Sequence, residues 1–119
     1  MKPSIESDLF RLKHIQDCIE KITILVHSCK TVAVFKSRWI EQDAMIRNFE
    51  IIGEASNHIS DDIKKSYPNI EWYKMRGMRN FMSHEYFGVR PETIWDTAVE
   101  NIPILKLQIA EIITAIEVK

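Results

Sequence analysis

Apolar side chains recur every three or four residues over most of the chain, a spacing that predicts helices packed on one face. Residues 5–26 form one such series, and a second helix is expected from about Arg38 to Ile59. Pro91 suits the first turn of a last helix, which Pro103 should kink or split. The expected core positions are Ile5, Leu9, Leu12, Ile15, Ile19, Ile22 and Val26, then Ile40, Ala44, Met45, Phe49, Ile52 and Ile59, and finally Ile94, Ala98, Ile102, Leu105, Ile109, Ile112 and Ile116.

Shorter segments connect these three series. Residues 31–35 are too few to be assigned to strand or helix, whereas residues 61–67 predict a short helix and residues 71–84 a longer one. The 119 residues contain only three glycines and four prolines, and their number is typical of one domain. We therefore expect a single domain over residues 1–119, folded as an all-α, up-and-down bundle of four main helices plus a short helix.

One segment departs from the usual separation of apolar and charged side chains. Residues 74–90 read KMRGMRNFMSHEYFGVR. On a regular helix an apolar stripe would contain Trp72, Met75, Met78, Met82 and Tyr86. At about 100° per residue Arg79 would fall in the middle of that stripe, and His84 would point about 140° away from it. A guanidinium on an apolar face must pair, reach solvent or meet a partner, so this segment is the strongest candidate for function.

The charge distribution points to the same segment. The formal net charge is −1, which argues against a protein that coats nucleic acid by charge alone. Residues 63–90, however, contain six basic and two acidic side chains. On charge alone, a chance cluster on a solvated face is the favoured explanation of this excess, ahead of a binding site.

Several classes of protein and site are not expected. No apolar run has the length of a signal peptide core or a membrane span, so we expect a cytoplasmic protein. Cys18 and Cys29 lack paired spacing and predict two reduced, packed thiols. The four histidines show no metal-ligand spacing, and the isolated glycines form no phosphate-binding loop, so neither a metal nor a cofactor is expected.

The segment IIGEAS, residues 51–56, lies in the second expected helix. Gly53 costs helix stability and would permit a close approach of another helix. Glu54 is either a solvent-facing acid or a partner of Arg47 or Arg79, and Arg47 itself reads equally well as a plain surface residue.

Within residues 74–90, Asn80 and His84 are four residues apart and share one helix face. A histidine can exchange a proton near neutral pH, while an arginine grips phosphate oxygens without titrating. Proton transfer beside charge stabilisation is what phosphodiester cleavage requires. An arginine and a histidine at this spacing are nevertheless a weak signal by themselves.

A longer string is more specific. GMRNFMSHEYFGV, with IIGEAS before it and TIWDTAVENIPIL after it, resembles the HepT-like branch of the HEPN superfamily over residues 43–107. The pattern of that branch, R-x4-H-x-Y, is met by Arg79, His84 and Tyr86, with Asn80 as the polar residue after the arginine.

The resemblance implies a helical toxin that homodimerises and cleaves RNA without a metal ion. His84 would act as general base and acid in attack by the RNA 2′-OH, Arg79 would stabilise the phosphate, and Asn80 would orient the ribose or the imidazole. The partner implied is a minimal nucleotidyltransferase, an antitoxin that adenylylates Tyr86 and silences the toxin. Glu54, Arg47 and Ser83 are candidate supporting residues.

The divergence of Arg79 and His84 on one ideal helix leaves two arrangements open. The helix loosens near Ser83, or two motif helices meet in a dimer, with Trp72, Met75, Met82 and Tyr86 facing the partner. The second arrangement also explains the apolar stripe, so we expect a homodimer with Arg79 and His84 at the mouth of its interface. Two other functions also remain: a non-catalytic subunit that binds substrate for a nucleotidyltransferase, and a structural bundle whose arginine reaches solvent.

Overall fold

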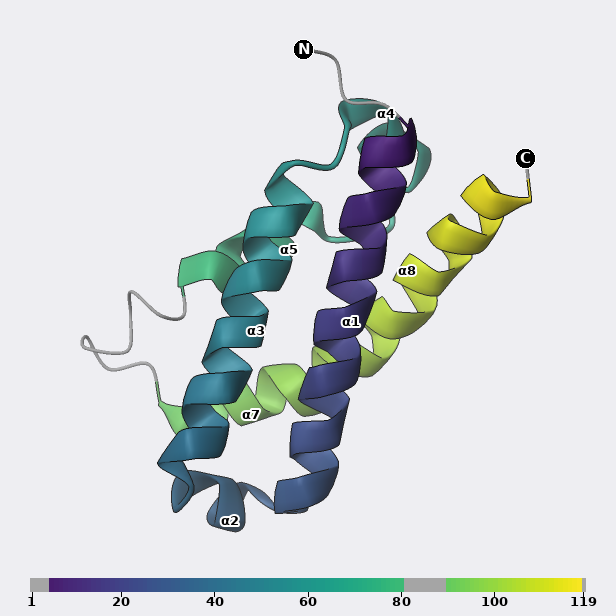
Figure 1. Cartoon of the computed structure of the whole chain (residues 1–119). Helices are drawn as coiled ribbons and strands as arrows, with labels where there is room; N and C mark the ends of the chain where they lie inside the picture. Colours follow the sequence, from purple (N-terminus) through teal and green to yellow (C-terminus); the bar gives the residue numbers. More distant parts are fainter. Residues whose placement is uncertain (1–4, 81–89, 119) are drawn as a thin grey trace.

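A computed structural model describes residues 5–80 and 90–118, and these residues contain helices and no strand. The two longest segments of the first half, α1 (Ile5–Cys29) and α3 (Trp39–Asn57), run antiparallel and side by side (Figure 1). The last segment of the chain crosses behind them. The predicted all-α bundle is confirmed.

The helical spacing of apolar residues produces the core. The side chains of Leu12, Ile15 and Ile19 on α1 are fully buried, as are those of Phe49 and Ile52 on α3. Two expected core residues, Ile5 and Ile40, are instead exposed. Both lie in the first turn of their helices, at opposite ends of the bundle, where fewer neighbours cover a side chain.

The connector between α1 and α3 forms a short helix, α2 (Val32–Lys36), which the sequence left unassigned. Lys30 ends α1 in the left-handed conformation, with φ of 70°. The Thr31 hydroxyl then accepts a hydrogen bond from the Val34 N–H at 3.2 Å and caps the new helix. Local capping therefore sets this turn.

The predicted short helix is present as α4 (Asp61–Ser66). Its N-cap, Ser60, is tied to α1 by the buried carboxylate of Asp8, which accepts hydrogen bonds from the Ser60 N–H at 2.9 Å and hydroxyl at 2.6 Å. The segment that follows is thereby anchored before it turns toward the candidate site.

The helix predicted over residues 71–84 is confirmed as an α-helix only for residues 72–77 and differs in type over residues 78–80. The α-helix α5 (Trp72–Gly77) stops at Gly77, and residues Met78–Asn80 form a tighter 3-10 turn, η1. Met75 and Met78 are buried in the protein's own core, and Trp72 packs against it. Met75 therefore does not face a second subunit as predicted, because its side chain is buried, whereas Trp72 is only partly buried. Met82 and Tyr86 lie outside the described residues.

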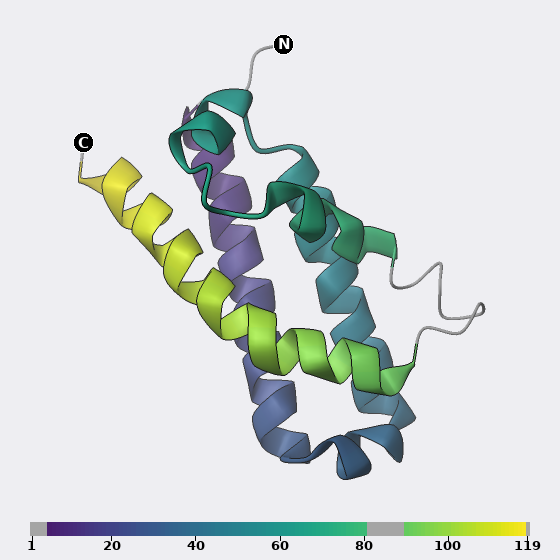
Figure 2. The same cartoon turned by 180° about the vertical axis from the view of Figure 1, so that it is seen from behind.

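The last helix is bent, as Pro103 predicts. It consists of α7 (Pro91–Asp96), a π-helical turn η3 (Thr97–Asn101), and α8 (Ile102–Glu117), and the bend is visible in Figure 2. Pro103 lacks an N–H and its ring crowds the carbonyl one turn earlier, so the wider turn falls just before it. No helix in the described part of the chain is long and apolar enough to span a membrane.

Candidate active site

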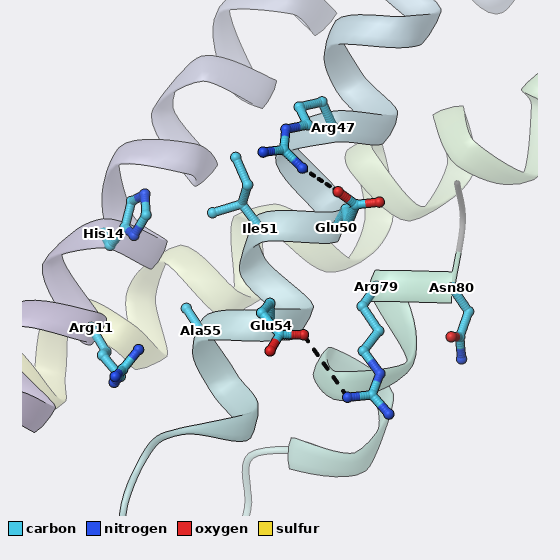
Figure 3. Close-up of a pocket in the computed structure, with 9 residues that line it drawn as sticks. All are labelled: Arg11, His14, Arg47, Glu50, Ile51, Glu54, Ala55, Arg79 and Asn80. Carbon is cyan, nitrogen blue, oxygen red and sulfur yellow. Dashed lines mark hydrogen bonds and ion pairs between the residues drawn. The ribbon is translucent and has the colours of Figure 1, made fainter. Parts of the chain in front are cut away.

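An open cleft of about 530 Å³ lies where α1, α3 and η1 meet. Helix α3 forms its floor, α1 one wall and η1 the other (Figure 3). The lining side chains are Arg11 and His14 from α1, Arg47, Glu50, Ile51, Glu54 and Ala55 from α3, and Arg79 and Asn80 from η1. Two of the predicted catalytic residues and two of the predicted supporting residues are thus brought together.

Gly53 allows η1 to approach α3 closely. A Cβ at this position would lie 2.4 Å from the Arg79 backbone nitrogen and 2.9 Å from the Arg79 Cβ. No side chain fits into these distances, so the expected close approach at Gly53 is confirmed. The contact fixes the backbone of Arg79 against the floor of the cleft.

The 3-10 turn changes where Arg79 points. Because α5 ends at Gly77, the angle of about 100° per residue does not apply to Arg79. Met78 is directed into the core, and Arg79 stands at the cleft with 42% of its side chain exposed. The guanidinium therefore does not lie on the apolar face, and the angular reasoning that favoured two motif helices loses its basis.

Glu54 is a partner of Arg79 and not merely a solvent-facing acid. Its Oε2 lies 3.9 Å from Arg79 Nη1, and its Oε1 lies 3.2 Å from His58 Nε2. The Glu54 side chain is 59% exposed, so this long ion pair is weak and an anion in the cleft can compete for Arg79. Arg47 pairs with Glu50, one turn along α3, and is largely exposed.

The remaining predicted site residues, Ser83, His84 and Tyr86, lie outside the described residues. Asn80, the last described residue before them, also lines the cleft. Their predicted roles stay predictions. Among the described residues, no three His, Cys, Asp or Glu side chains are grouped so that they could hold a metal ion.

The sequence did not single out Arg11, His14 or Glu50 as site residues. Arg11 and His14 alternate with the buried Leu12 and Ile15 along α1, as surface residues on any amphipathic helix do. Only the antiparallel packing of α1 against α3 brings them to the cleft. Their place in the site depends on how the helices pack, which the spacing of residues along the sequence does not show.

The cleft is suited to an oxyanion. Arginines stand on the floor and on both walls, and a guanidinium offers several N–H donors in a plane that matches phosphate oxygens. Ile51 and Ala55 add an apolar strip between the charged groups. Phosphate on the walls and an apolar ring on the floor would both be accommodated.

A family model described as "Ribonuclease HepT-like" matches residues 15–112. The chain belongs to the HepT-like ribonuclease family. The recognised resemblance is therefore confirmed. "Probable ribonuclease HepT" of Thermococcus cleftensis is 49% identical over 65 residues, which cover 55% of this chain and 59% of that protein.

A second relative, "Putative RNase MJ1380" of Methanocaldococcus jannaschii, is 41% identical over 66 residues, or 56% of this chain and 61% of its own length. The matched segment thus spans about six tenths of the length of each of these two relatives. No solved structure matches the chain significantly.

Proposed function

We propose that this HepT-like chain is an endoribonuclease that cleaves RNA without a metal ion, using Arg79 and His84. The observation that carries the proposal is the Arg79 guanidinium, which stands in a basic cleft with its backbone fixed against Gly53. The names of the relatives, which describe ribonucleases, support the choice of RNA as substrate.

The proposed reaction is an internal transfer at one phosphate. His84 takes the proton of the RNA 2′-OH as its oxygen forms a bond to phosphorus, and the bond to the 5′-oxygen breaks. The protonated imidazole then returns the proton to the 5′-oxygen, leaving a 2′,3′-cyclic phosphate. Arg79 stabilises the negative charge on the phosphate oxygens, and Asn80 orients the ribose or the imidazole.

The decisive experiment is RNA cleavage in the presence of EDTA, with Arg79→Ala and His84→Ala alongside the unchanged protein. We expect a loss of about 10²-fold or more for each variant, since each removes one catalytic group. The cyclic phosphate end is read by mass spectrometry. Cleavage that persists unchanged in both variants rejects the assignment. RNA binding without cleavage in the unchanged protein favours the non-catalytic subunit instead.

We further propose that the protein is the toxin of a cytoplasmic toxin–antitoxin pair, controlled at Tyr86 by a nucleotidyltransferase. The Tyr86 oxygen would attack the α-phosphorus of ATP, forming a bond to AMP and releasing pyrophosphate. The family supports this proposal. After incubation with ATP and the partner, the mass should rise by whole multiples of AMP and cleavage should fall. A Tyr86→Phe variant that gains the same mass rejects this site.

Homodimerisation is proposed on the same grounds. The buried Met75 excludes the face first considered, so the contact would use another surface. Sedimentation at micromolar concentration tests it, and a monomer that cleaves RNA contradicts it.

A further inference from the structure

The α1 wall of the cleft carries basic groups that have no role in the proposed chemistry. Arg11 and His14 are one turn apart and line the cleft opposite η1 (Figure 3). Arg11 is half-buried, yet its side chain makes no ion pair or hydrogen bond with any part of the chain that the structure describes. The centroid of the His14 ring lies 6.4 Å from that of the Phe10 ring.

The other two arginines of the cleft differ from Arg11 in this respect. Arg47 pairs with Glu50, and Arg79 approaches Glu54 at 3.9 Å. Among the lining residues that the structure describes, three arginines therefore face two glutamates, which leaves one positive charge uncompensated when His14 is neutral. That charge is located on α1, where half-burial also limits its screening by water.

Between the α1 wall and Arg79 lies the apolar part of the floor. Ile51 is partly exposed and Ala55 almost fully buried, and both line the cleft. The floor therefore offers a small aliphatic surface, mainly that of Ile51, to a flat ring. The cleft thus has a basic wall, an apolar floor and a second basic wall. A single-stranded nucleic acid carries matching groups in the same order, since each base has a phosphate on either side of it. The cleft volume of about 530 Å³ is within the range of sites that hold a small organic ligand.

We propose that Arg11 and His14 form a second phosphate-binding subsite, which holds the RNA strand beside the phosphate that Arg79 engages. The inference rests on the proposed ribonuclease function. Arg11 would bind one phosphate through its guanidinium fork, and His14 would donate an N–H to the same group. The intervening base would lie over Ile51 and Ala55.

The test measures binding apart from cleavage. A fluorescent single-stranded RNA with 2′-O-methyl groups throughout cannot react at its 2′-oxygens, and its binding is followed by anisotropy over a series of salt concentrations. Arg11→Ala should weaken binding about tenfold, as expected for the loss of a charged hydrogen bond. The slope of log K against log salt should become shallower by about 0.7, the value for one phosphate contact to a single strand.

Lys13→Ala is the matched control. Lys13 lies on the same helix but pairs with Glu117 of α8 at 3.0 Å, away from the cleft. Its removal takes one positive charge from the protein, as the Arg11 variant does, and should change affinity less than twofold. His14→Ala, at an exposed position, should weaken binding about threefold and provides a second variant in which folding is not at risk.

In cleavage of unmodified RNA, Arg11→Ala should raise KM in proportion to the loss of affinity, with a much smaller effect on kcat. Equal affinity and equal salt slope in Arg11→Ala and the unchanged protein overturn the inference, as does an unchanged protein that binds no RNA. If Arg11→Ala weakens RNA binding only because it separates two copies in sedimentation, the α1 wall is a contact between copies and the inference also fails.

These outcomes are separable from the failure of the proposed function. Cleavage that depends on Arg79 and His84 but not on Arg11 retains the ribonuclease and rejects the subsite. Salt-dependent binding that requires Arg11, in a protein that cleaves nothing, retains the subsite as an RNA-binding element and rejects the catalytic assignment.

Discussion

At the scale of single residues, one absent side chain positions Arg79. Gly53 lies inside a long helix, where glycine costs about 1 kcal/mol relative to alanine. In return, η1 comes close enough that the Arg79 nitrogen occupies the space of a Cβ. Gly53 thus lowers the stability of α3 but allows the Arg79 guanidinium to reach the cleft.

The consequence is testable with a pair of glycine variants. Gly53→Ala must displace the Arg79 backbone, because a contact of 2.4 Å to a backbone atom cannot be relieved by rotating a side chain. We expect the gain in helix propensity to be outweighed, with a net loss of about 1–2 kcal/mol in the free energy of unfolding. RNA cleavage should fall at least about tenfold, since a small displacement of a catalytic group is costly.

Gly77→Ala is the matched control for that experiment. A Cβ at Gly77 meets nothing within 4 Å, although Gly77 lies only two residues from Arg79. Urea unfolding should show this variant to be as stable as the unchanged protein or slightly more so, with normal cleavage. Equal damage in both variants would mean that the close approach at Gly53 has no special role.

At the scale of elements, the regular helices were predictable from the sequence, but the turn that positions Arg79 and Asn80 was not. The apolar stripes of α1, α3 and α8 follow directly from burial on one face, and Pro103 marks the bend. The predicted helix over residues 71–84 becomes a 3-10 turn after Gly77, at the point where the Arg79 backbone comes within the distance of a Cβ contact at Gly53 of α3. That distance is a tertiary quantity that a local pattern does not contain.

The buried face of α1 also protects its thiols. Cys18 and Cys29 are free and each is 1% exposed, as the sequence predicted for packed, reduced cysteines. Burial raises the pKa of both thiols above its ordinary value. The folded protein therefore keeps these protons at a pH where the unfolded chain has lost them.

Two measurements follow from the raised pKa values. At pH 8 a thiol reagent should react with the folded protein at least about tenfold more slowly than with the urea-unfolded chain, since only the accessible thiolate reacts. The contribution of the thiols to stability is complete below the unfolded pKa of about 8.5 and is lost as pH rises above it. Urea titrations at pH 8 and pH 10 measure this loss. Rapid labelling of the folded protein at pH 8 would contradict the burial of both thiols.

At the scale of the whole molecule, local charge matters more than net charge. The chain is slightly acidic overall, and the segment with an excess of basic residues, 63–90, contains Arg79, the one of its basic residues described in the cleft. That excess could not reveal Arg11 or Arg47, which reach the same cleft from helices whose sequences are acidic on balance. The candidate site was therefore predictable where one segment supplies it and hidden where three segments converge.

Glutamine substitutions can separate local charge from net charge. Glu54→Gln removes an acid that lies 3.9 Å from Arg79, whereas Glu117→Gln removes one that pairs with Lys13 on another face. Both raise the net charge by one. A unit charge at such short range contributes about 1 kcal/mol in a water-exposed setting, so Glu54→Gln should tighten binding of the 2′-O-methyl RNA about threefold to fivefold. Glu117→Gln should change it less than twofold, because the solvent screens that charge from the cleft.

Equal tightening in both variants would mean that overall charge governs binding and that the cleft has no special part in it. Weaker binding in Glu54→Gln would instead identify Glu54 as the group that holds Arg79 in its binding position.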